Sequence, residues 1–246
     1  MTAAAERARA PVVVWLHEVD STQSHAFLLG AENAPDGTAV VADVQTAGRG
    51  RRGRAWRAEP GTSLLVSILV RPRLPVAKLP LLSLTTAVAL AETLAESGVP
   101  ARIKWPNDVL ARGRKIAGIL LESRTGTATL VAVGVGVNLL QRGFDGDLEA
   151  RATSAYLETG RALDRGALLQ AFLARFARWR ARLEKVGFEP VRERWLALND
   201  TIGDAVSIDG LTGLARDLDG AGALLVDDGA TVHRVVAGAL DDAARR

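Results

Sequence analysis

The sequence has 246 residues, of which 48% are hydrophobic and 4% aromatic, and its formal net charge is +3. This length suits one large domain or a medium domain with a small one, and the apolar content is ample for a core. The charge is too weak by itself to indicate bulk nucleic-acid binding. Cysteine is absent, which excludes disulfides, thiolate catalysis and zinc–thiolate sites. The histidines His17, His25 and His233 lie too far apart for metal-ligand spacing.

Neither a targeting segment nor a membrane span is predicted. Residues 1–10 carry the acidic Glu6 and no apolar core, so they do not resemble a signal peptide. The longest apolar stretch, 79–94, is interrupted by polar residues and is too short to cross a bilayer. We therefore expect a cytoplasmic protein with no membrane partner.

The hydrophobic patterns predict strands and helices in mixed order. Ser21 and its neighbours offer N-caps for the first helix, Pro80 suits a helix start, Gly98 suits a stop, and Arg112-Gly113-Arg114 predicts a hairpin turn. Strands are expected at 12–16, 38–44, 63–70, 101–105, 109–110, 116–122 and 127–139, and helices at 22–33, 80–96, 162–186 and 190–197. Short turns between strands, with the helices in blocks, predict an α+β fold with a mixed or largely antiparallel sheet.

The character of the sequence changes after Asn199. Short β-prone runs at 205–208, 213–217, 223–226 and 231–237 are separated by glycine and aspartate. They predict a small β-barrel of roughly 45 residues, a size that is marginal alone and is expected to dock on the main domain. The expected domains are 1–198 and 199–246.

The basic loop 48–56 reads Gly48-Arg49-Gly50-Arg51-Arg52-Gly53-Arg54-Ala55-Trp56. Clustered charge repels itself and glycine is costly to order, so an anion is expected to order this loop. It fits a phosphate or carboxylate cradle, but also a flexible solvated loop or an arginine–glycine nucleic-acid tail. It matches neither a Walker loop nor a dinucleotide fingerprint.

Three further motifs combine polar groups with turn or strand signals. The run Lys104-Trp105-Pro106-Asn107-Asp108 fits either a site, with Asp108 near a cation and Lys104 near an anion, or a capped β-turn. Lys115 opens an otherwise apolar strand and is either a cation at a cavity mouth or an ordinary edge lysine. The run Gly134-Val135-Gly136-Val137-Asn138 fits a bare surface for a purine or a β-bulge.

In chain order, these motifs resemble those of the biotin–protein ligases. The loop is similar to the family signature Gly-Arg-Gly-Arg-x-Gly-Arg-x-Trp, preceded by Asp-Ser-Thr and by Gln45. Lys-Trp-Pro-Asn-Asp, a lysine before Ala-Gly-Ile-Leu, and Gly-x-Gly-x-Asn follow in the family's order, and the C-terminal segment is similar to its SH3-like barrel. The resemblance spans nearly the whole chain. It implies an enzyme that makes biotinyl-5′-AMP from biotin and ATP, then transfers biotin to a lysine of a carrier domain.

The resemblance also implies roles for individual residues. Lys115 is the expected catalytic cation, Arg51 the group that retains the adenylate, and Asp108 a candidate for binding magnesium or positioning the incoming lysine. Trp56 and Trp105 are expected in a wall or in the core. The implied biotin contacts are Ser21, Thr22, Gln45, Gly48, Arg49, Arg51, Lys115 and Gly118, and the implied ATP or adenylate contacts are Arg49, Arg51, Arg54, Lys104, Lys115, Gly136 and Asn138.

The chain departs from the family pattern at two places. Gln23 stands where many relatives have asparagine, and 152–156 lacks the tryptophan that some relatives place over adenine. Only about ten residues precede the first predicted strand, so we expect no N-terminal DNA-binding domain and no repressor function.

Three other interpretations stay open. A lipoate or octanoate ligase shares the implied fold but has a different glycine-rich signature. An RNA-binding module would use the basic loop, although the patch is short and the total charge nearly balanced. An inactive family member would keep the fold without the reaction. The expected partners are biotin, ATP with Mg²⁺ and a biotin carboxyl carrier domain, with no DNA, and the chain is expected to be a monomer or weak homodimer.

Overall fold

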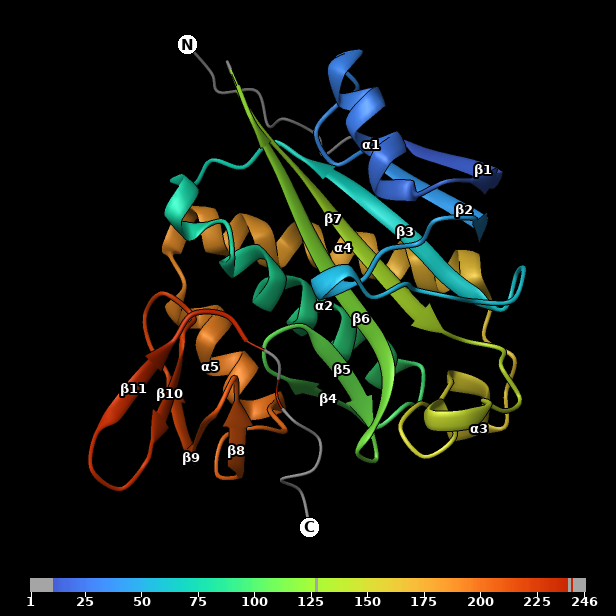
Figure 1. Ribbon diagram of the computed structural model, residues 1–246. Coiled ribbons are helices and arrows are strands. Elements are labelled where there is room, and N and C mark those ends of the chain that lie inside the picture. Colours follow the sequence, from blue (N-terminus) through green and yellow to red (C-terminus); the bar gives the residue numbers. More distant parts are fainter. Residues whose placement is uncertain (1–10, 127, 239, 241–246) are drawn as a thin grey trace.

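A seven-stranded mixed sheet forms the centre of the protein. The computed structural model describes residues 11–126, 128–238 and 240 (Figure 1). The strand order is β1-β2-β3-β7-β6-β5-β4, with β1 and β2 parallel and the other neighbours antiparallel, which confirms the expected sheet type. The strands are β1 (Val13–Val19), β2 (Ala39–Gln45), β3 (Ser63–Val70), β4 (Ala101–Lys104), β5 (Asp108–Ala111), β6 (Arg114–Thr125) and β7 (Thr129–Asn138).

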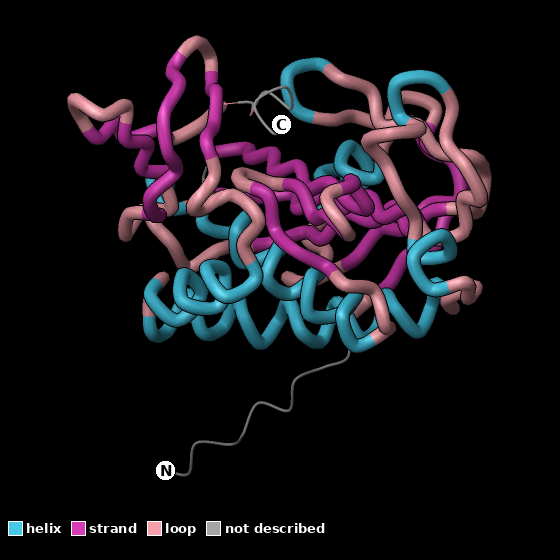
Figure 2. The backbone as a smooth tube through the Cα atoms, turned by 90° about the horizontal axis from the view of Figure 1, so that it is seen from below, coloured by secondary structure: helices cyan, strands magenta, loops and turns pink. Residues whose placement is uncertain are grey.

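Helices cover both faces of this sheet unequally. Figure 2 shows most of them gathered in one layer on one side of the strands. On that side α2 packs against α4 and α5, whereas α1 contacts β2, β3 and β7. The α-helices are α1 (Thr22–Ala31), α2 (Leu81–Glu96), α3 (Ala155–Thr159), α4 (Arg165–Val186) and α5 (Glu189–Leu198).

The two-residue period of the strands divides the core between the two faces. Val41 and Val133 belong to the large cluster that contains α2, while Val40 and Ala132 belong to a smaller cluster beneath α1. Successive side chains of a strand point to opposite faces, so each strand serves both layers. Because both faces are covered, central strands such as β3 are buried at every position.

α2 is the central helix of the large layer. The segment Val76–Glu96 is long and apolar enough to cross a membrane by length and composition, yet 67% of its most apolar window is buried inside the protein. Its buried Thr85 and Thr86 hydroxyls donate to the carbonyls of Leu81 and Leu82 at 2.7 and 2.6 Å, so burial leaves these groups satisfied. These features are those of a core helix.

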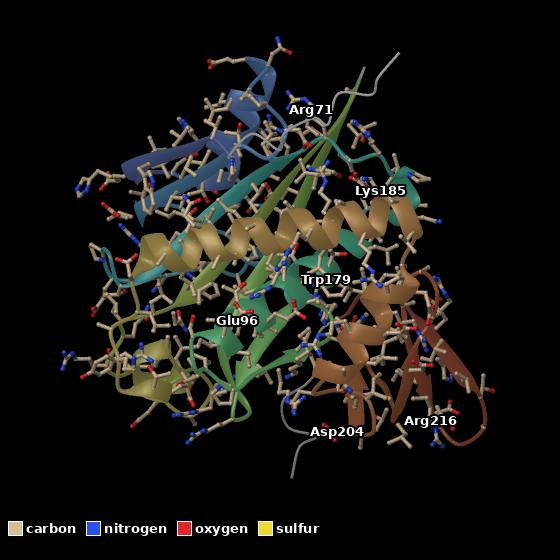
Figure 3. The ribbon with its side chains drawn as sticks, turned by 180° about the vertical axis from the view of Figure 1, so that it is seen from behind. Arg71, Glu96, Trp179, Lys185, Asp204 and Arg216 are labelled. Carbon is tan, nitrogen blue, oxygen red and sulfur yellow. The ribbon has the colours of Figure 1, made fainter. Side chains whose placement is uncertain are left out.

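α4 closes the back of this layer through polar contacts. Figure 3 shows α4, which carries Trp179, crossing the back of the molecule. The Trp179 indole donates to Glu92 of α2 at 2.9 Å, and the buried Arg175 pairs with Glu92 and Glu96. A buried arginine is tolerated here because carboxylates face it.

The C-terminal segment forms a separate four-stranded antiparallel sheet. Its order is β11-β10-β9-β8, and Ile208 also bridges to Leu240. The strands are β8 (Ala205–Ile208), β9 (Leu211–Leu218), β10 (Leu224–Asp227) and β11 (Val232–Val235). The sheet docks through the turn between β9 and β10, where the Gly222 carbonyl accepts from the Trp105 indole at 3.3 Å. The small β-rich unit expected from the sequence is therefore present and docked.

The structure corrects several boundaries. β1 continues to Val19, three residues beyond the expected end, and α1 ends at Ala31 rather than at residue 33. α3 was not predicted, because it is only five residues long and its signal is the Ser154 N-cap. The Trp105–Pro106 peptide bond is cis. Residues 1–10, on which the expectations about a leader and a DNA-binding domain depend, and Thr127 lie outside the described residues.

The docking turn leads to a stability prediction. Gly222 has a φ of +80°, and a Cβ there would lie 2.7 Å from Leu84 and 2.9 Å from Leu81. Gly222→Ala should therefore destabilise the protein by about 2 kcal/mol through overpacking and backbone strain. Thermal unfolding followed by circular dichroism should show a fall in Tm of about 4–8 °C.

Gly220→Ala is the matched control, because a Cβ at Gly220 meets nothing within 4 Å in the same turn. Its Tm should stay within about 2 °C of the parent value. Equal melting of the two variants would contradict the docking geometry.

Candidate active site

A strip without side chains crosses the α1 face of the central sheet. Gly118 of β6 pairs with Gly136 of β7, and Gly134 lies two residues away on the same face of β7. Alternation places these glycines on the face opposite the α2 layer. The sheet therefore presents bare backbone beside the N-terminus of α1.

Trp56 lies directly on this strip. A Cβ at Gly136 would lie 2.5 Å from Cε2 of the indole, and one at Gly118 would lie 3.0 Å from Cζ3. Any side chain at Gly136 would displace the ring. The buried indole N–H has no hydrogen-bond partner among the described residues. Trp56 is thus a wall residue, as expected, and it carries an unused donor.

The basic loop 48–56 folds back on itself to bring Trp56 there. The Trp56 amide donates to the Gly48 carbonyl at 3.0 Å, and Arg49 bridges to Ala55 as in an antiparallel pair. A Cβ at Gly48 would lie 2.5 Å from the Trp56 carbonyl oxygen, so this close approach requires glycine. Figure 1 shows the turn of this loop lying over β6 and β7.

Arg49 ties the loop to two elements of the main domain. Its guanidinium donates to both oxygens of Glu122 on β6, at 3.0 and 2.8 Å, and to the Ser24 hydroxyl on α1 at 3.1 Å. This fork is the geometry in which arginine binds a carboxylate most strongly. Arg49, predicted as a ligand contact, here spans the opening between α1 and β6.

Arg51 points to the turn after β4. It donates to the Asn107 side-chain oxygen at 2.9 Å, and Asn107 in turn donates to the Ile119 carbonyl at 2.7 Å. Burial lowers the pKa of the Arg51 guanidinium from its ordinary value, while the Asp108 carboxylate acts in the opposite direction. Arg51 remains a cation at any physiological pH. A half-buried cation is therefore held beside the Asn107–Asp108 turn.

Lys115 and Asp108 form an ion pair in the same region. Lys115 Nζ lies 2.7 Å from Asp108 Oδ1 and 5.7 Å from the centroid of the Trp56 ring. Their side chains are 37% and 26% exposed, so the pair is accessible without being fully hydrated. A lysine ammonium has three donors, and one contact with Asp108 leaves others for an anion.

The other end of the strip is lined by small polar groups. Gln45 Oε1 accepts from the Thr22 amide at 2.8 Å and from the Thr22 hydroxyl at 3.0 Å, and the Ser67 hydroxyl lies 2.7 Å from that of Thr22. Ser21 caps α1 and is 1% exposed. The structure therefore places Ser21, Thr22 and Gln45, each predicted as a biotin contact, in one largely buried cluster that can bind a small polar group.

Gln23, to which no role was assigned, forms part of the floor. It is 4% exposed, and its amide donates to the carbonyls of Leu120 and Ala132 at 3.1 and 3.4 Å. A Cβ at Gly134 would lie 2.9 Å from Gln23 Cδ. The side chain thus joins β6 to β7 across the glycine strip. The sequence signal for this role is the position of Gln23 in the first turn of α1.

Asn138 and the segment after β7 close one side of the site. The Asn138 amide donates to the Thr153 carbonyl at 3.0 Å, and the Thr153 amide donates to the Lys115 carbonyl at 2.9 Å. Arg142 stacks on the Tyr156 ring at 4.6 Å. Asn138 is predicted to contact adenine. In the structure its amide holds Thr153, which in turn binds the backbone of Lys115.

The remaining predicted positions surround this centre. Lys104 ends β4 opposite Asp108, and Arg54 is exposed at the end of the loop. No cluster of three histidine or acidic side chains able to hold a metal occurs among the described residues. Asp108 instead pairs with Lys115 and belongs to no such cluster within the described part of the chain. The magnesium role of Asp108 stays a prediction without geometric support.

A cavity of about 420 Å³ lies next to the glycine strip rather than on it. It runs between the start of α2, the turn at Trp105 and the C-terminal sheet, and it meets the site at Arg51, Asn107 and Glu122. Trp56, by contrast, lies on the strip itself. The cations Arg51 and Lys115 and the small polar groups lie around the strip rather than around this cavity, which only Arg51 among them lines.

The family model and the similar known proteins all point to biotin or lipoate ligases. Residues 15–138 match the Biotin/lipoate A/B protein ligase family. The chain is 39% identical to the biotin–[acetyl-CoA-carboxylase] ligase of Paracoccus denitrificans, covering 86% of this chain and 92% of that protein. It is 34% identical to the bifunctional ligase/repressor BirA of Bacillus subtilis, covering 89% of this chain and 70% of that protein.

A solved structure agrees with this match over nearly the full length. The biotin protein ligase from Aquifex aeolicus in complex with biotin and ATP superposes with a TM-score of 0.83 at 31% identity, covering 94% of this chain and 97% of that chain. The glycine strip, the basic loop and the Lys115–Asp108 pair all lie within the matched residues 15–138. This chain belongs to the biotin protein ligase family.

Proposed function

We propose that this protein activates biotin with ATP and transfers it to one lysine of a biotin carboxyl carrier domain. One observation supports this proposal: a largely buried polar cluster and a set of fixed cations lie at opposite ends of a side-chain-free strip. One end suits an uncharged ring with donors and acceptors, and the other suits two anions. Biotin has such a ring and a carboxylate, and ATP supplies the second anion.

The ring end is formed by Ser21, Thr22 and Gln45. The ureido group of biotin has one acceptor and two donors, and hydroxyl and amide side chains can bind both kinds of group. Because Thr22 and Gln45 are already bonded to each other at 2.8 and 3.0 Å, their positions are set before a ligand arrives. Such preorganisation reduces the entropy lost on binding.

The anion end supports the first step. A carboxylate oxygen of biotin attacks the α-phosphorus of ATP, the bond to the bridging oxygen breaks, and pyrophosphate leaves with its electron pair. Two anions must approach each other, so fixed positive charge lowers the barrier without reorganisation. Lys115, held 2.7 Å from Asp108, is the proposed cation between the two groups. Arg51 is proposed to cover the resulting adenylate.

The second step needs no further activation. The neutral amine of the acceptor lysine attacks the carbonyl carbon of the mixed anhydride, the C–O bond breaks with its electron pair going to AMP, and an amide forms as the nitrogen gives up one proton to solvent. Asp108 is proposed to position that amine, since its carboxylate already binds one ammonium. Trp56 excludes water from the strip, which limits hydrolysis of the anhydride.

Magnesium is proposed to enter bound to the phosphates of ATP, since the described residues include no cluster for holding it. The domains are proposed to be 1–198, which binds both substrates, and 199–246. We propose a cytoplasmic monomer or weak homodimer.

Lys115→Ala should strongly reduce biotin-dependent exchange of pyrophosphate into ATP. Losing a fixed cation at a developing charge costs about 3–4 kcal/mol, by comparison with the loss of one oxyanion donor, so exchange should fall by about 100-fold or more. Isotope exchange with labelled pyrophosphate measures this directly.

The matched control is Lys78→Ala, which removes an exposed lysine of the turn before α2. Its exchange rate should equal that of the parent protein. Near-normal exchange in Lys115→Ala would remove Lys115 from the catalytic role.

Arg51→Gly should release the adenylate before it reaches the acceptor. The loop would keep its other contacts but would lose the cation that Asn107 holds at 2.9 Å. Free biotinyl-5′-AMP acylates exposed lysines, so an unrelated protein in the reaction should become biotinylated. Avidin blotting of added serum albumin measures the release.

Arg161→Gly, an exposed arginine in the loop after α3, is the control and should label only the carrier domain. Labelling that stays confined to the carrier in Arg51→Gly would show that another group retains the adenylate.

A further inference from the structure

The basic loop 48–56 touches the C-terminal sheet at one place that the proposed chemistry does not use. Arg52 Nη2 donates to both carboxylate oxygens of Asp209, at 2.8 and 2.6 Å. The two residues are 157 positions apart in the chain. This contact therefore links the loop over the site to a different sheet.

Asp209 is held in a tight turn. β8 ends at Ile208 and β9 begins at Leu211, so Asp209 and Gly210 alone form the connection. Their φ values are +51° and +90°, the pattern of the two-residue hairpin turn that favours Asp-Gly. Ile208 behind the turn is 2% exposed. The carboxylate of Asp209 is thus presented from a fixed position.

Arg52 adopts an unusual backbone conformation to reach it. Its φ is +56°, in the left-handed region that side-chain-bearing residues rarely adopt, and Gly53 follows with a φ of +72°. Because the backbone reverses here, the adjacent side chains of Arg51 and Arg52 point in different directions. Arg51 binds Asn107 in the site, whereas Arg52 binds Asp209 in the C-terminal sheet.

Electrostatics favours the same arrangement. Arg51 and Arg52 repel each other, and Asp209 attracts both; the hydrogen bond from Arg52 is the main cause of a lowered pKa at the Asp209 carboxyl. With Arg49 bound to Glu122, the loop is fastened to the main sheet on one side and to the C-terminal sheet on the other.

We propose that Asp209 is a positioning residue, which holds the basic loop closed through Arg52 and so keeps Arg51 over the adenylate. The C-terminal sheet thereby contributes to retaining the intermediate without touching it. This inference rests on the proposed function. The Arg52 and Asp209 side chains are 48% and 51% exposed, so the effect is expected to be graded rather than absolute.

Asp209→Asn is the direct test, because asparagine keeps the size and tolerates the left-handed conformation while losing the charge. Enzyme loaded with labelled biotin and ATP in the presence of pyrophosphatase is passed through a desalting column, and the release of biotinyl-5′-AMP is timed. Release should be about two- to fivefold faster than in the parent protein, the range expected for one exposed ion pair. Trypsin should also cleave the loop arginines faster.

Asp227→Asn is the matched control. It removes a carboxylate from a surface pair with Arg216 inside the C-terminal sheet, at 2.9 Å. Its release rate should equal the parent rate, and both variants should melt within about 2 °C of the parent. Equal release from Asp209→Asn and the parent, or equally fast release from Asp227→Asn, would overturn the proposal.

The salt dependence of adenylate release distinguishes an ionic tether from a purely structural role of Asp209. The difference between parent and Asp209→Asn should disappear near 1 M salt, where exposed charges are screened within about 3 Å. A difference that persists there would contradict an ionic tether.

Should Asp209→Asn fail to fold, Arg52→Asn breaks the same pair from the loop side, with the same expected release. A parent protein that forms no retained adenylate would refute the proposed function itself, which is a different result.

Discussion

The close approach of Trp56 to a backbone without side chains is the constraint on which the site depends. A Cβ at Gly136 would lie 2.5 Å from the indole, so this position must be glycine for the ring to lie on the sheet. Gly118 pairs opposite Gly136 and extends the same bare surface to β6. Once the ring lies there, the loop that carries it must cross the strands, and its arginines come to surround the strip.

That arrangement reconciles a charged loop with a folded protein. Four arginines in nine residues repel one another, yet three of them meet a partner on a different element: Glu122 on β6, Asn107 after β4 and Asp209 after β8. Each contact is modest because it is partly exposed. Together they distribute the charge around the strip, where the proposed reaction brings a carboxylate and a phosphate together.

The sequence predicts the elements well where burial sets the pattern. Ser63–Val70 and Ala205–Ile208 occupy the predicted residues, since their apolar runs and flanking turn residues leave little choice. Short elements such as α3 escape prediction, because five residues carry almost no periodic signal. The order of motifs along the chain is sufficient to indicate the family, which the comparisons confirm.

The contacts within the site could not be read from the chain. Arg49 and Glu122 are 73 positions apart, and their pairing depends on the register of β6 and on the path of the loop. The role of Gln23 cannot be predicted from its own segment, because the carbonyls that it binds, those of Leu120 and Ala132, come from two later strands. The sequence shows which residue types are present, whereas register and loop path decide which of them meet.

The most direct test of the account is intact-mass and peptide mass spectrometry of a biotin carboxyl carrier domain incubated with the purified protein, biotin and magnesium ATP. The account predicts the addition of one biotinyl group at one lysine, with release of AMP and pyrophosphate, and none when either biotin or ATP is left out. Transfer of lipoate in place of biotin, or no modification of the carrier despite a folded protein, would contradict it.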